Sequence, residues 1–272
     1  MLKHKIGTIK GYHILKRREV IMQRTLLVLL LSTLLFWFGC SNKNIHIYLI
    51  GDSTMANKPI DDNPERGWGQ VLGSFFSEEV EIHNHAKNGR STKSFIDEGR
   101  WQTVFDSLQS GDYVMIQFGH NDQKEYDSTR YAAPYGAYKT NLEKFVTESR
   151  AKGAQPILIT PVMRRRFNEQ GQFYDTHGDY PQVVRDVAVK KNVPLIDLHQ
   201  ASREMITSLG EEESKRIFLW VEPGIYGRFP EGKQDNTHFS EYGAREVATL
   251  VVQAIQELNL DLNKYIKSKV SG

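Results

Sequence analysis

The sequence predicts an α/β fold: a three-layer α/β/α sandwich built around a parallel sheet. Two observations predict it. Short apolar runs recur along the chain and alternate with segments of helical period; the runs lie at 45–50, 80–82, 113–118, 156–160 and 193–198. The runs are nearly continuous in apolar residues, which is typical of parallel strands covered on both faces. Right-handed crossovers between such strands place helices on both sides of the sheet.

Three stretches between or after these runs have apolar side chains at helical spacing, so that one face of each would be buried. The first stretch carries Trp68, Val71, Leu72, Phe75 and Phe76. The second carries Val183, Val184, Val187 and Ala188. The last is expected to begin at Ser240 as N-cap, and its apolar stripe consists of Val247, Leu250, Val251, Ala254, Ile255 and Leu258.

The composition is that of one large globular domain. The chain has 272 residues, of which 39% are hydrophobic and 25% are charged, and this length is sufficient for a substantial core. Its 35 basic and 33 acidic residues leave a net charge of only +2. No global field favours nucleic acid, so we expect no nucleic-acid partner, and an acidic substrate would have to be recognised locally. We expect a monomer with one domain over 41–272.

The N-terminal region has the pattern of an export signal. Residues 25–39 are almost entirely apolar, and they follow Met22 and Arg24. A permanent transmembrane helix is the alternative, but such a helix needs about 20 apolar residues. We therefore predict a signal peptide at 22–40, a natural start at Met22, and a non-native upstream extension at 1–21.

Cys40 is the only cysteine, so the chain cannot form an internal disulfide. Its place directly after the apolar stretch resembles a bacterial lipoprotein cleavage site, at which the cysteine becomes the lipidated first residue. This resemblance implies an exported protein of the bacterial cell envelope, facing the periplasm or the cell surface, that contacts the membrane only through a lipid anchor at Cys40. The alternatives are secretion without an anchor and an incidental thiol.

Four polar segments are expected to meet at one edge of the sheet. Ligands of open parallel sheets bind beyond the carboxyl ends of the strands. Gly51-Asp52-Ser53-Thr54 follows the first run directly, Asn88-Gly89-Arg90-Ser91 follows the second within its connecting loop, and Gly119-His120-Asn121-Asp122 follows the third. Asp235-Asn236-Thr237-His238 is expected in the loop that enters the last helix.

These segments contain the residue types of a serine hydrolase. A serine hydroxyl becomes nucleophilic when an imidazole takes its proton, and a carboxylate fixes that imidazole. Ser53, His238 and Asp235 can supply the three groups, since only three positions separate Asp235 from His238. No Gly-x-Ser-x-Gly pentapeptide is present, which argues against a typical α/β-hydrolase elbow. A solvated turn and helix cap is the alternative for Asp235 and His238.

Donors for an oxyanion are also present. Gly89 allows a backbone N–H to approach a substrate closely, Asn121 offers a side-chain amide, and the Ser53 N–H completes the set. Structural alternatives are a turn glycine with positive φ for Gly89 and an Asx-turn for Asn121.

Together the four segments resemble the four blocks of the SGNH (GDSL-type) hydrolase superfamily. The resemblance implies a flavodoxin-like five-stranded parallel sheet, Ser53 as nucleophile, His238 as base, Asp235 as its partner, and an oxyanion hole of Ser53, Gly89 and Asn121. With Gly67-Trp68-Gly69, the strings look most like rhamnogalacturonan acetylesterases, which remove acetyl groups from pectin through an acetyl-enzyme without a metal or cofactor. This implies an acetylated polysaccharide or oligosaccharide as substrate.

The sequence contains fewer signals for the residues that bind the substrate. A guanidinium after the fourth strand could pair with a galacturonate carboxylate, and Trp220 could stack on a sugar ring, although a solvated basic loop and an aromatic that packs its own loop are the alternatives. His120 and His177 are expected to be structural or to line the substrate site, and no spacing suggests a metal site. The candidate substrate-binding residues are Asp52, Arg90, His120, Arg164, Arg165 and Trp220.

Several functions remain open at this stage. Related esterases act on acetylxylan or other acetylated carbohydrates and share parts of the same strings. A lipase or thioesterase would need an apolar groove, whereas the loops here are polar and rich in arginine. A sugar-binding lipoprotein without catalysis is a further alternative, but the complete set of five candidate active-site residues argues against it.

Overall fold

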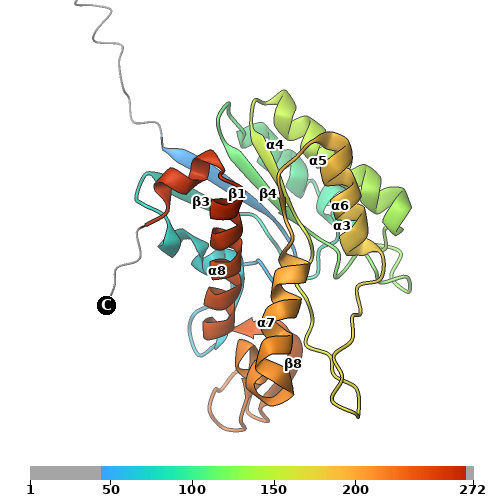
Figure 1. The fold of residues 1–272 in the computed structure, drawn as a ribbon, viewed down its shortest axis with the longest axis vertical. Helices are drawn as coiled ribbons and strands as arrows, with labels where there is room; N and C mark the ends of the chain where they lie inside the picture. The colour runs from blue at the N-terminus through green and yellow to red at the C-terminus, as the bar shows by residue number, and fades with distance from the viewer. Residues whose placement is uncertain (1–43, 268–272) are drawn as a thin grey trace, which may run out of the picture. The chain divides into compact units, whose positions relative to one another are not determined.

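The structure of the protein is a computed structural model that describes residues 44–267 (Figure 1). The predicted extension at 1–21, the predicted signal peptide at 22–40 and Cys40 lie outside the described residues. None of the helices in 44–267 is long and apolar enough to cross a membrane.

Five parallel strands form the central sheet, in the order β3-β1-β4-β5-β6. The strands are β1 (Ile45–Gly51), β3 (Val80–Asn84), β4 (Tyr113–Gln117), β5 (Gln155–Ile159) and β6 (Leu195–Ile196). This is the flavodoxin-like order 2-1-3-4-5, so the predicted fold class is confirmed. The last strand is shorter than the apolar run at 193–198, because Asp197 accepts a hydrogen bond from the Gln200 N–H and thereby begins the next helix.

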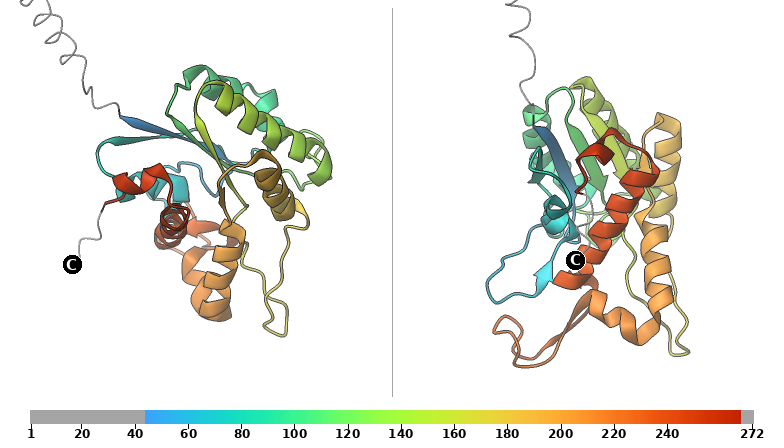
Figure 2. Two further views of the ribbon diagram at one scale, coloured as in Figure 1. Left: turned by 45° about the horizontal axis from the view of Figure 1, so that its top comes forward. Right: turned by 60° about the vertical axis from the view of Figure 1, so that its left-hand side comes forward.

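Helices cover both faces of this sheet (Figure 2). On one face lie α2 (Trp68–Val71), α7 (Leu198–Glu213) and α8 (Glu241–Glu257). Each is followed in the chain by a short helix on the same face: η1 (Leu72–Phe75), η3 (Ser214–Ile217) and η4 (Asp261–Tyr265). On the other lie α3 (Thr92–Asp97), α4 (Arg100–Ser107), η2 (Pro134–Tyr138), α5 (Lys139–Ala151) and α6 (Tyr180–Lys191). Within β1, Ile47 and Leu49 pack into the first layer, whereas Tyr48 and Ile50 pack into the second. The alternation of a doubly covered strand thus produces two separate cores.

Residues 68–76 do not form the single regular helix that the sequence predicts, although several of the side chains predicted to be buried are buried. The chain makes one α-helical turn, continues as the 3-10 helix η1 and becomes extended at Phe76. Trp68, Leu72 and Phe76 are buried. Gly69 and Gly73 weaken a regular helix here, and two bonds fix the segment to the sheet edge instead: the Trp68 N–H donates to Thr54 O at 2.9 Å and its indole donates to the Gln117 side chain at 2.6 Å.

The last helix follows the prediction more closely. The Ser240 hydroxyl caps α8 by accepting from the Gly243 N–H at 3.0 Å. Val247, Val251 and Ile255 are fully buried, while Leu258 lies at the C-cap and is 41% exposed, so its assignment to the core is wrong. The four apolar positions predicted for α6 are all buried.

Close packing of α8 gives a stability prediction at Gly243. A Cβ atom there would overlap the backbone carbonyl of Ile217. We expect Gly243→Ala to lower the free energy of unfolding by about 3 kcal/mol or more through this overlap, although alanine normally favours a helix interior by about 1 kcal/mol. Urea denaturation measures the change. Gly73→Ala is the control, since its Cβ would only touch Ile82 at 3.4 Å; equal losses in both variants would contradict the packing account.

A second, antiparallel sheet of three strands was not predicted. It has the order β2-β8-β7 and consists of β2 (Glu65–Arg66), β7 (Phe218–Val221) and β8 (Lys233–Ser240). Asp235 and His238 therefore lie on a strand rather than in a loop, which corrects the sequence prediction. The polar run from Lys233 to His238 carries no alternating apolar pattern, so its pairing depends on the neighbouring strands.

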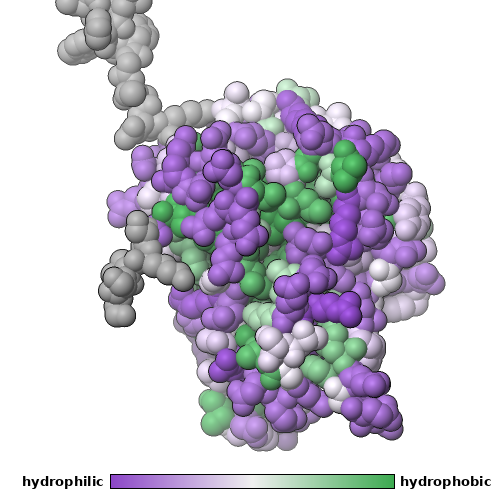
Figure 3. Space-filling view, viewed as in Figure 1, coloured by the Kyte–Doolittle hydropathy of each residue, from purple (hydrophilic) through white to green (hydrophobic). Residues whose placement is uncertain are grey.

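The surface in the view of Figure 3 is mostly hydrophilic, with apolar side chains visible beside α8. A groove between α7 and α8 is lined in part by Leu195, Met205, Leu250, Ala254 and Leu258.

Candidate active site

The four polar segments meet in one cleft at the carboxyl end of the central sheet. The cleft has a volume of about 440 Å³, within the usual range for small-molecule sites. Its lining combines the loops after β1, β3, β4 and β5 with strands of the second sheet: Ser53, Glu65, Asn88, Gly89, His120, Asn121, Lys124, Arg164, Thr237 and His238. The two sheets thus build the cleft together.

Ser53, His238 and Asp235 form a continuous hydrogen-bonded relay. Ser53 Oγ lies 2.8 Å from His238 Nε2, and His238 Nδ1 lies 2.8 Å from Asp235 Oδ2. The other oxygen of Asp235 accepts the backbone N–H groups of Thr237 and His238 at 2.8 and 3.0 Å. These bonds orient the carboxylate, which holds the hydrogen of His238 on Nδ1 and leaves Nε2 as the acceptor facing the serine hydroxyl.

The same contacts keep Asp235 ionised. Burial alone would raise the pKa of this carboxyl, but the hydrogen bond and charge of His238, together with the two backbone N–H groups, outweigh burial and lower the pKa well below its ordinary value. A carboxylate with a low pKa remains negatively charged while the imidazole beside it gains a proton. The arrangement is therefore suited to stabilising a transient imidazolium at His238.

Three residues of the cleft carry N–H donors without a full set of partners. Gly89 has a φ of +77°, a left-handed conformation that favours glycine, and lines the cleft together with Ser53 and Asn121. Within 44–267, the backbone N–H groups of Ser53 and Gly89 donate to no other residue. The Asn121 amide donates one hydrogen to Arg90 O at 3.1 Å, and its second hydrogen remains for the cleft. These three groups can donate hydrogen bonds to a developing oxyanion.

Lys124 and Glu65 line the cleft but were not among the predicted residues. Lys124 Nζ donates to Asn121 Oδ1 at 2.8 Å and so fixes which way the amide points. Glu65 pairs at 2.7 Å with the buried ammonium of Lys58, which also donates to Asn88 Oδ1. Lys124 follows Asn121 by three residues and was within reach of sequence reasoning, whereas nothing in the pattern of 57–66 indicated Glu65.

Asp52 does not reach the cleft, which corrects its assignment as a substrate-binding residue. Its side chain is fully buried, accepts two hydrogen bonds from Thr54, and lies 3.1 Å from His120 Nδ1. Burial would raise the pKa of Asp52, but His120 and Thr54 lower it to about 2. His120 itself lines the cleft as predicted, although it is only 4% exposed.

The lowered pKa of Asp52 predicts loss of stability in acid. The unfolded chain binds a proton at Asp52 near pH 3.8, the folded protein only near pH 2. The pKa of His177 is also lowered, in this case by burial, from 6.5 to about 3. Between pH 6.5 and 3 at His177, and between pH 3.8 and 2 at Asp52, the unfolded chain holds more protons than the folded protein. The free energy of unfolding therefore falls as pH drops from 6.5 towards 2. In urea denaturation, Asp52→Asn should cost about 1–3 kcal/mol at pH 7 and make the acid dependence shallower. A wild-type stability that is constant from pH 6.5 to 3 would contradict this.

The arginines after β5 divide between two environments. Arg164 lines the cleft as predicted and donates to Thr176 Oγ1 at 3.1 Å. Burial lowers its pKa to about 10, so the guanidinium stays charged at neutral pH. Arg165 is buried and donates to Ser214 Oγ and Asn236 Oδ1, both at 3.0 Å. Its assignment as a substrate-binding residue is corrected, because these bonds turn it away from the cleft.

Trp220 is also not part of the cleft lining. Its indole donates to Asn236 Oδ1 at 2.9 Å, and its ring packs against the cations of Arg165 and Lys215 at 5.2 and 4.7 Å from the ring centroid. These contacts hold the β7–β8 pair together, so the sugar-stacking assignment of Trp220 is corrected too.

In the described part of the chain there are two groups of side chains that each bring together three potential metal ligands. One is the surface set His46, Glu81 and His83; the other is Asp175, His177 and His199, next to the cleft. Neither is part of the Ser53 relay.

Comparison with known proteins places the chain in a family. The profile of the GDSL-like Lipase/Acylhydrolase family matches residues 49–246. The chain is 45% identical to the rhamnogalacturonan acetylesterase RhgT of Bacillus subtilis (strain 168) over 84% of this chain and 96% of the relative, and 40% identical to the probable rhamnogalacturonan acetylesterase YesY of the same organism over 81% and 97%.

A solved structure has the same fold. The crystal structure of protein YxiM from Bacillus subtilis superimposes with a TM-score of 0.69 at 26% identity, covering 80% of this chain and 58% of that one. The family profile covers the segments that carry Ser53, Gly89, Asn121, Asp235 and His238. The chain therefore belongs to the GDSL-like lipase/acylhydrolase family.

Proposed function

We propose that the protein is a carboxylic ester hydrolase that removes O-acetyl groups from a carbohydrate, namely acetylated rhamnogalacturonan, with Ser53, His238 and Asp235 as its catalytic triad. The observation that carries this is the relay of two 2.8 Å hydrogen bonds from Ser53 through His238 to Asp235, open to a polar cleft. The substrate follows from relatives named as rhamnogalacturonan acetylesterases that match nearly their whole length.

In this mechanism Ser53 Oγ attacks the acetyl carbonyl while His238 Nε2 takes the hydroxyl proton. The carbonyl oxygen becomes negatively charged, and the N–H groups of Ser53 and Gly89 and the Asn121 amide donate to it. His238 then gives its proton to the departing sugar hydroxyl, which leaves an acetyl-enzyme. Water, deprotonated by His238, releases acetate and restores the free serine.

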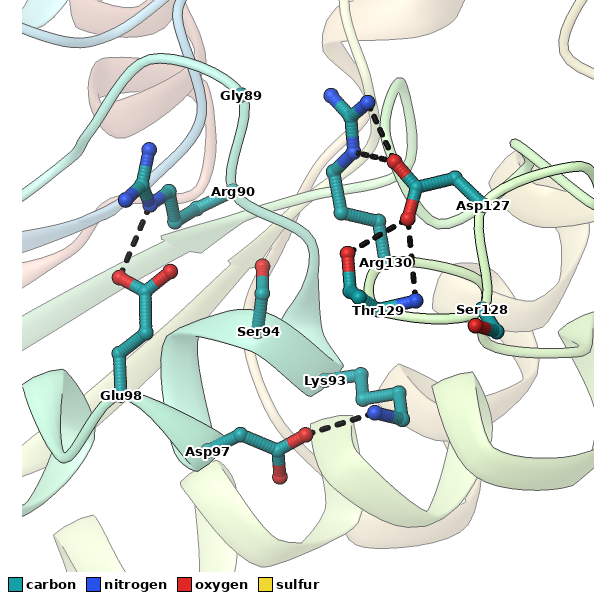
Figure 4. Close-up of a pocket in the computed structure, with 10 residues that line it drawn as sticks. All are labelled: Gly89, Arg90, Lys93, Ser94, Asp97, Glu98, Asp127, Ser128, Thr129 and Arg130. Atoms are coloured by element: carbon teal, nitrogen blue, oxygen red, sulfur yellow. Dashed lines mark hydrogen bonds and ion pairs between the residues drawn. The ribbon is translucent and has the colours of Figure 1, made fainter.

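The neighbouring surface suits a charged polysaccharide. A second pocket adjoins the cleft at Gly89, and its wall carries three ion pairs: Arg90 with Glu98 (3.0 Å), Lys93 with Asp97 (2.8 Å) and Arg130 with Asp127 (Figure 4). Charged and hydroxyl groups on this wall can bind the hydroxyls and carboxylates of a pectic chain. Arg90, predicted to bind substrate, would act here. A lipase would need an apolar groove at this place.

The proposed oxyanion hole predicts the effect of Asn121→Ala. The contact from Asn121 strengthens as charge develops, so turnover should fall by about 10²–10³-fold while KM changes little. Kinetics with a short-chain aryl acetate measure this split. Lys124→Met is a second variant for comparison. It removes the hydrogen bond to Asn121 Oδ1 but keeps the amide, so turnover should fall less than in Asn121→Ala. Unchanged turnover in Asn121→Ala would exclude the amide from the oxyanion hole.

The substrate assignment is tested by acetate release from acetylated rhamnogalacturonan, acetylated xylan and a short-chain aryl acetate. The purified protein should act fastest on the pectic polymer. Faster release from xylan would replace the proposed substrate, and cleavage of the aryl acetate alone would keep the hydrolase while excluding both polymers. No release from any of the three would overturn the proposed activity.

We further propose export and lipid anchoring at Cys40, which the apolar stretch at 25–39 and the adjoining cysteine support. Labelling of growing cells with a radioactive fatty acid tests this: label should enter the protein, and Cys40→Ser should abolish it.

A further inference from the structure

Three metal-ligating side chains meet beside the cleft, and none of them has a role in the ester hydrolysis described above. Asp175 and His177 lie in the segment between β5 and α6, and His199 is the second residue of α7. One carboxylate oxygen and two imidazole nitrogens lie within 4.8 Å of one another. Two imidazoles and one carboxylate form a ligand set that zinc commonly uses, with a water in the fourth position.

The His199 imidazole points to a missing partner. The residue is only 6% exposed, and neither ring nitrogen makes a hydrogen bond with any group in 44–267. Its Nε2 atom nevertheless lies 2.9 Å from Asp175 Oδ2. The two atoms are at ion-pair distance but are not aligned for a hydrogen bond, and two ligands of a common ion would show such a contact. An ion bound at Nε2 would give this buried nitrogen a partner.

The pair His120 and His177 gives an independent indication. Their Nε2 atoms face each other at 3.3 Å. His120 Nδ1 lies 3.1 Å from Asp52, and His177 Nδ1 lies 2.8 Å from Asp175. Carboxylates only accept hydrogen bonds, so each Nδ1 must carry a hydrogen. Two neutral rings would then oppose their lone pairs at Nε2.

A metal ion bound at His177 Nδ1 removes this conflict. The single hydrogen of that ring then resides on Nε2, where it donates to His120 Nε2, and His120 donates from Nδ1 to Asp52. An extra proton on the pair would also satisfy both rings, and the experiment below separates the two. The surrounding charges favour a cation, since Asp52 and Asp175 are both acidic and Arg164 supplies one positive charge.

We propose that Asp175, His177 and His199 bind one divalent transition-metal ion of the zinc type. Ligands around such an ion lie 2.0–2.2 Å from it, so the three side chains need to separate by roughly half an ångström from their present contacts. The ion would tie the segment after β5 to α7 and, through His177 and His120, fix the hydrogen-bond direction as far as Asp52, next to Ser53. Its part is to position these groups, and no reacting atom contacts it.

The test is calorimetric titration of the purified, chelator-treated protein with Zn²⁺. We expect one equivalent to bind to the wild type, and His199→Ala to weaken binding by at least about 100-fold, because even outer partners of a metal site affect affinity 10–100-fold. Zn²⁺ should also raise the unfolding temperature of the wild type but not of His199→Ala. Asp175→Asn, which keeps the side-chain shape at a partly exposed position, provides a second variant should His199→Ala fold poorly, and it should also bind more weakly.

The surface set His46, Glu81 and His83 supplies the control. There His46 Nδ1 lies 2.8 Å from His83 Nε2, and both rings are partly exposed. His83→Ala should leave the binding of one equivalent intact. Absence of Zn²⁺ binding in the wild type would overturn the proposal in favour of a proton shared by His120 and His177. Binding that survives His199→Ala and is lost in His83→Ala would overturn it in favour of the surface set.

Discussion

Replacing Ser53 with alanine is expected to lower the rate of acetate release by roughly 10⁴–10⁶-fold. The variant keeps the N–H donors and the cleft but has no oxygen to attack the acetyl carbonyl, so no acetyl-enzyme can form. The hydroxyl contacts His238 at 2.8 Å and its loss leaves no large cavity. The fold should therefore persist, with an unfolding temperature close to that of the wild type.

Stopped and continuous assays with a short-chain aryl acetate cover this range of rates. Ser74→Ala is the matched control, since Ser74 is exposed in η1 and lines neither the cleft nor the adjoining pocket; it should retain full activity. If Ser53→Ala keeps a tenth of the wild-type rate, another nucleophile performs the reaction and the proposed triad is wrong.

Asp235→Asn is the second change with a large expected effect, about 10⁴-fold in turnover. The asparagine oxygen can still accept the N–H groups of Thr237 and His238, so β8 should keep its conformation. Its amide nitrogen, however, would donate to His238 Nδ1. The hydrogen of the imidazole would then move to Nε2, which could no longer accept the proton of Ser53.

Turnover and KM for the aryl acetate, with Asp179→Asn as control, measure this effect. Asp179 is exposed at the start of α6 and its side chain caps no helix N–H, so its substitution should leave turnover unchanged. A loss below tenfold in Asp235→Asn would show that the carboxylate does not hold the imidazole hydrogen during catalysis.

The sequence predicts the central sheet because its signals are local. Each of the five strands is an apolar run, and the polar residues that end three of them mark the edge where Ser53, Gly89 and Asn121 meet. Helix capping by Ser240 is equally local. These parts depend on residues a few positions apart, which one sequence reveals without knowledge of the rest of the fold.

The remaining parts depend on distant contacts. Strand β8 is polar and exists because β2 and β7 pair with it. Arg165 and Trp220 look like substrate-binding residues in the sequence, but both turn to Asn236, 71 and 16 positions away. Asp52 adjoins Ser53 in the chain and yet is fully buried beside His120. His177 and His199 are 22 positions apart on different elements, so their spacing suggested no metal site.

The hydrogen bond between Ser53 and His238 joins residues 185 positions apart. During synthesis Ser53, Gly89 and Asn121 leave the ribosome early, while Asp235 and His238 follow only with β8. If the proposed triad is correct, a chain interrupted before β8 carries a serine that cannot be activated. Ester hydrolysis would then report only chains that are completed and folded through their last strand, and truncated products would contribute nothing to it.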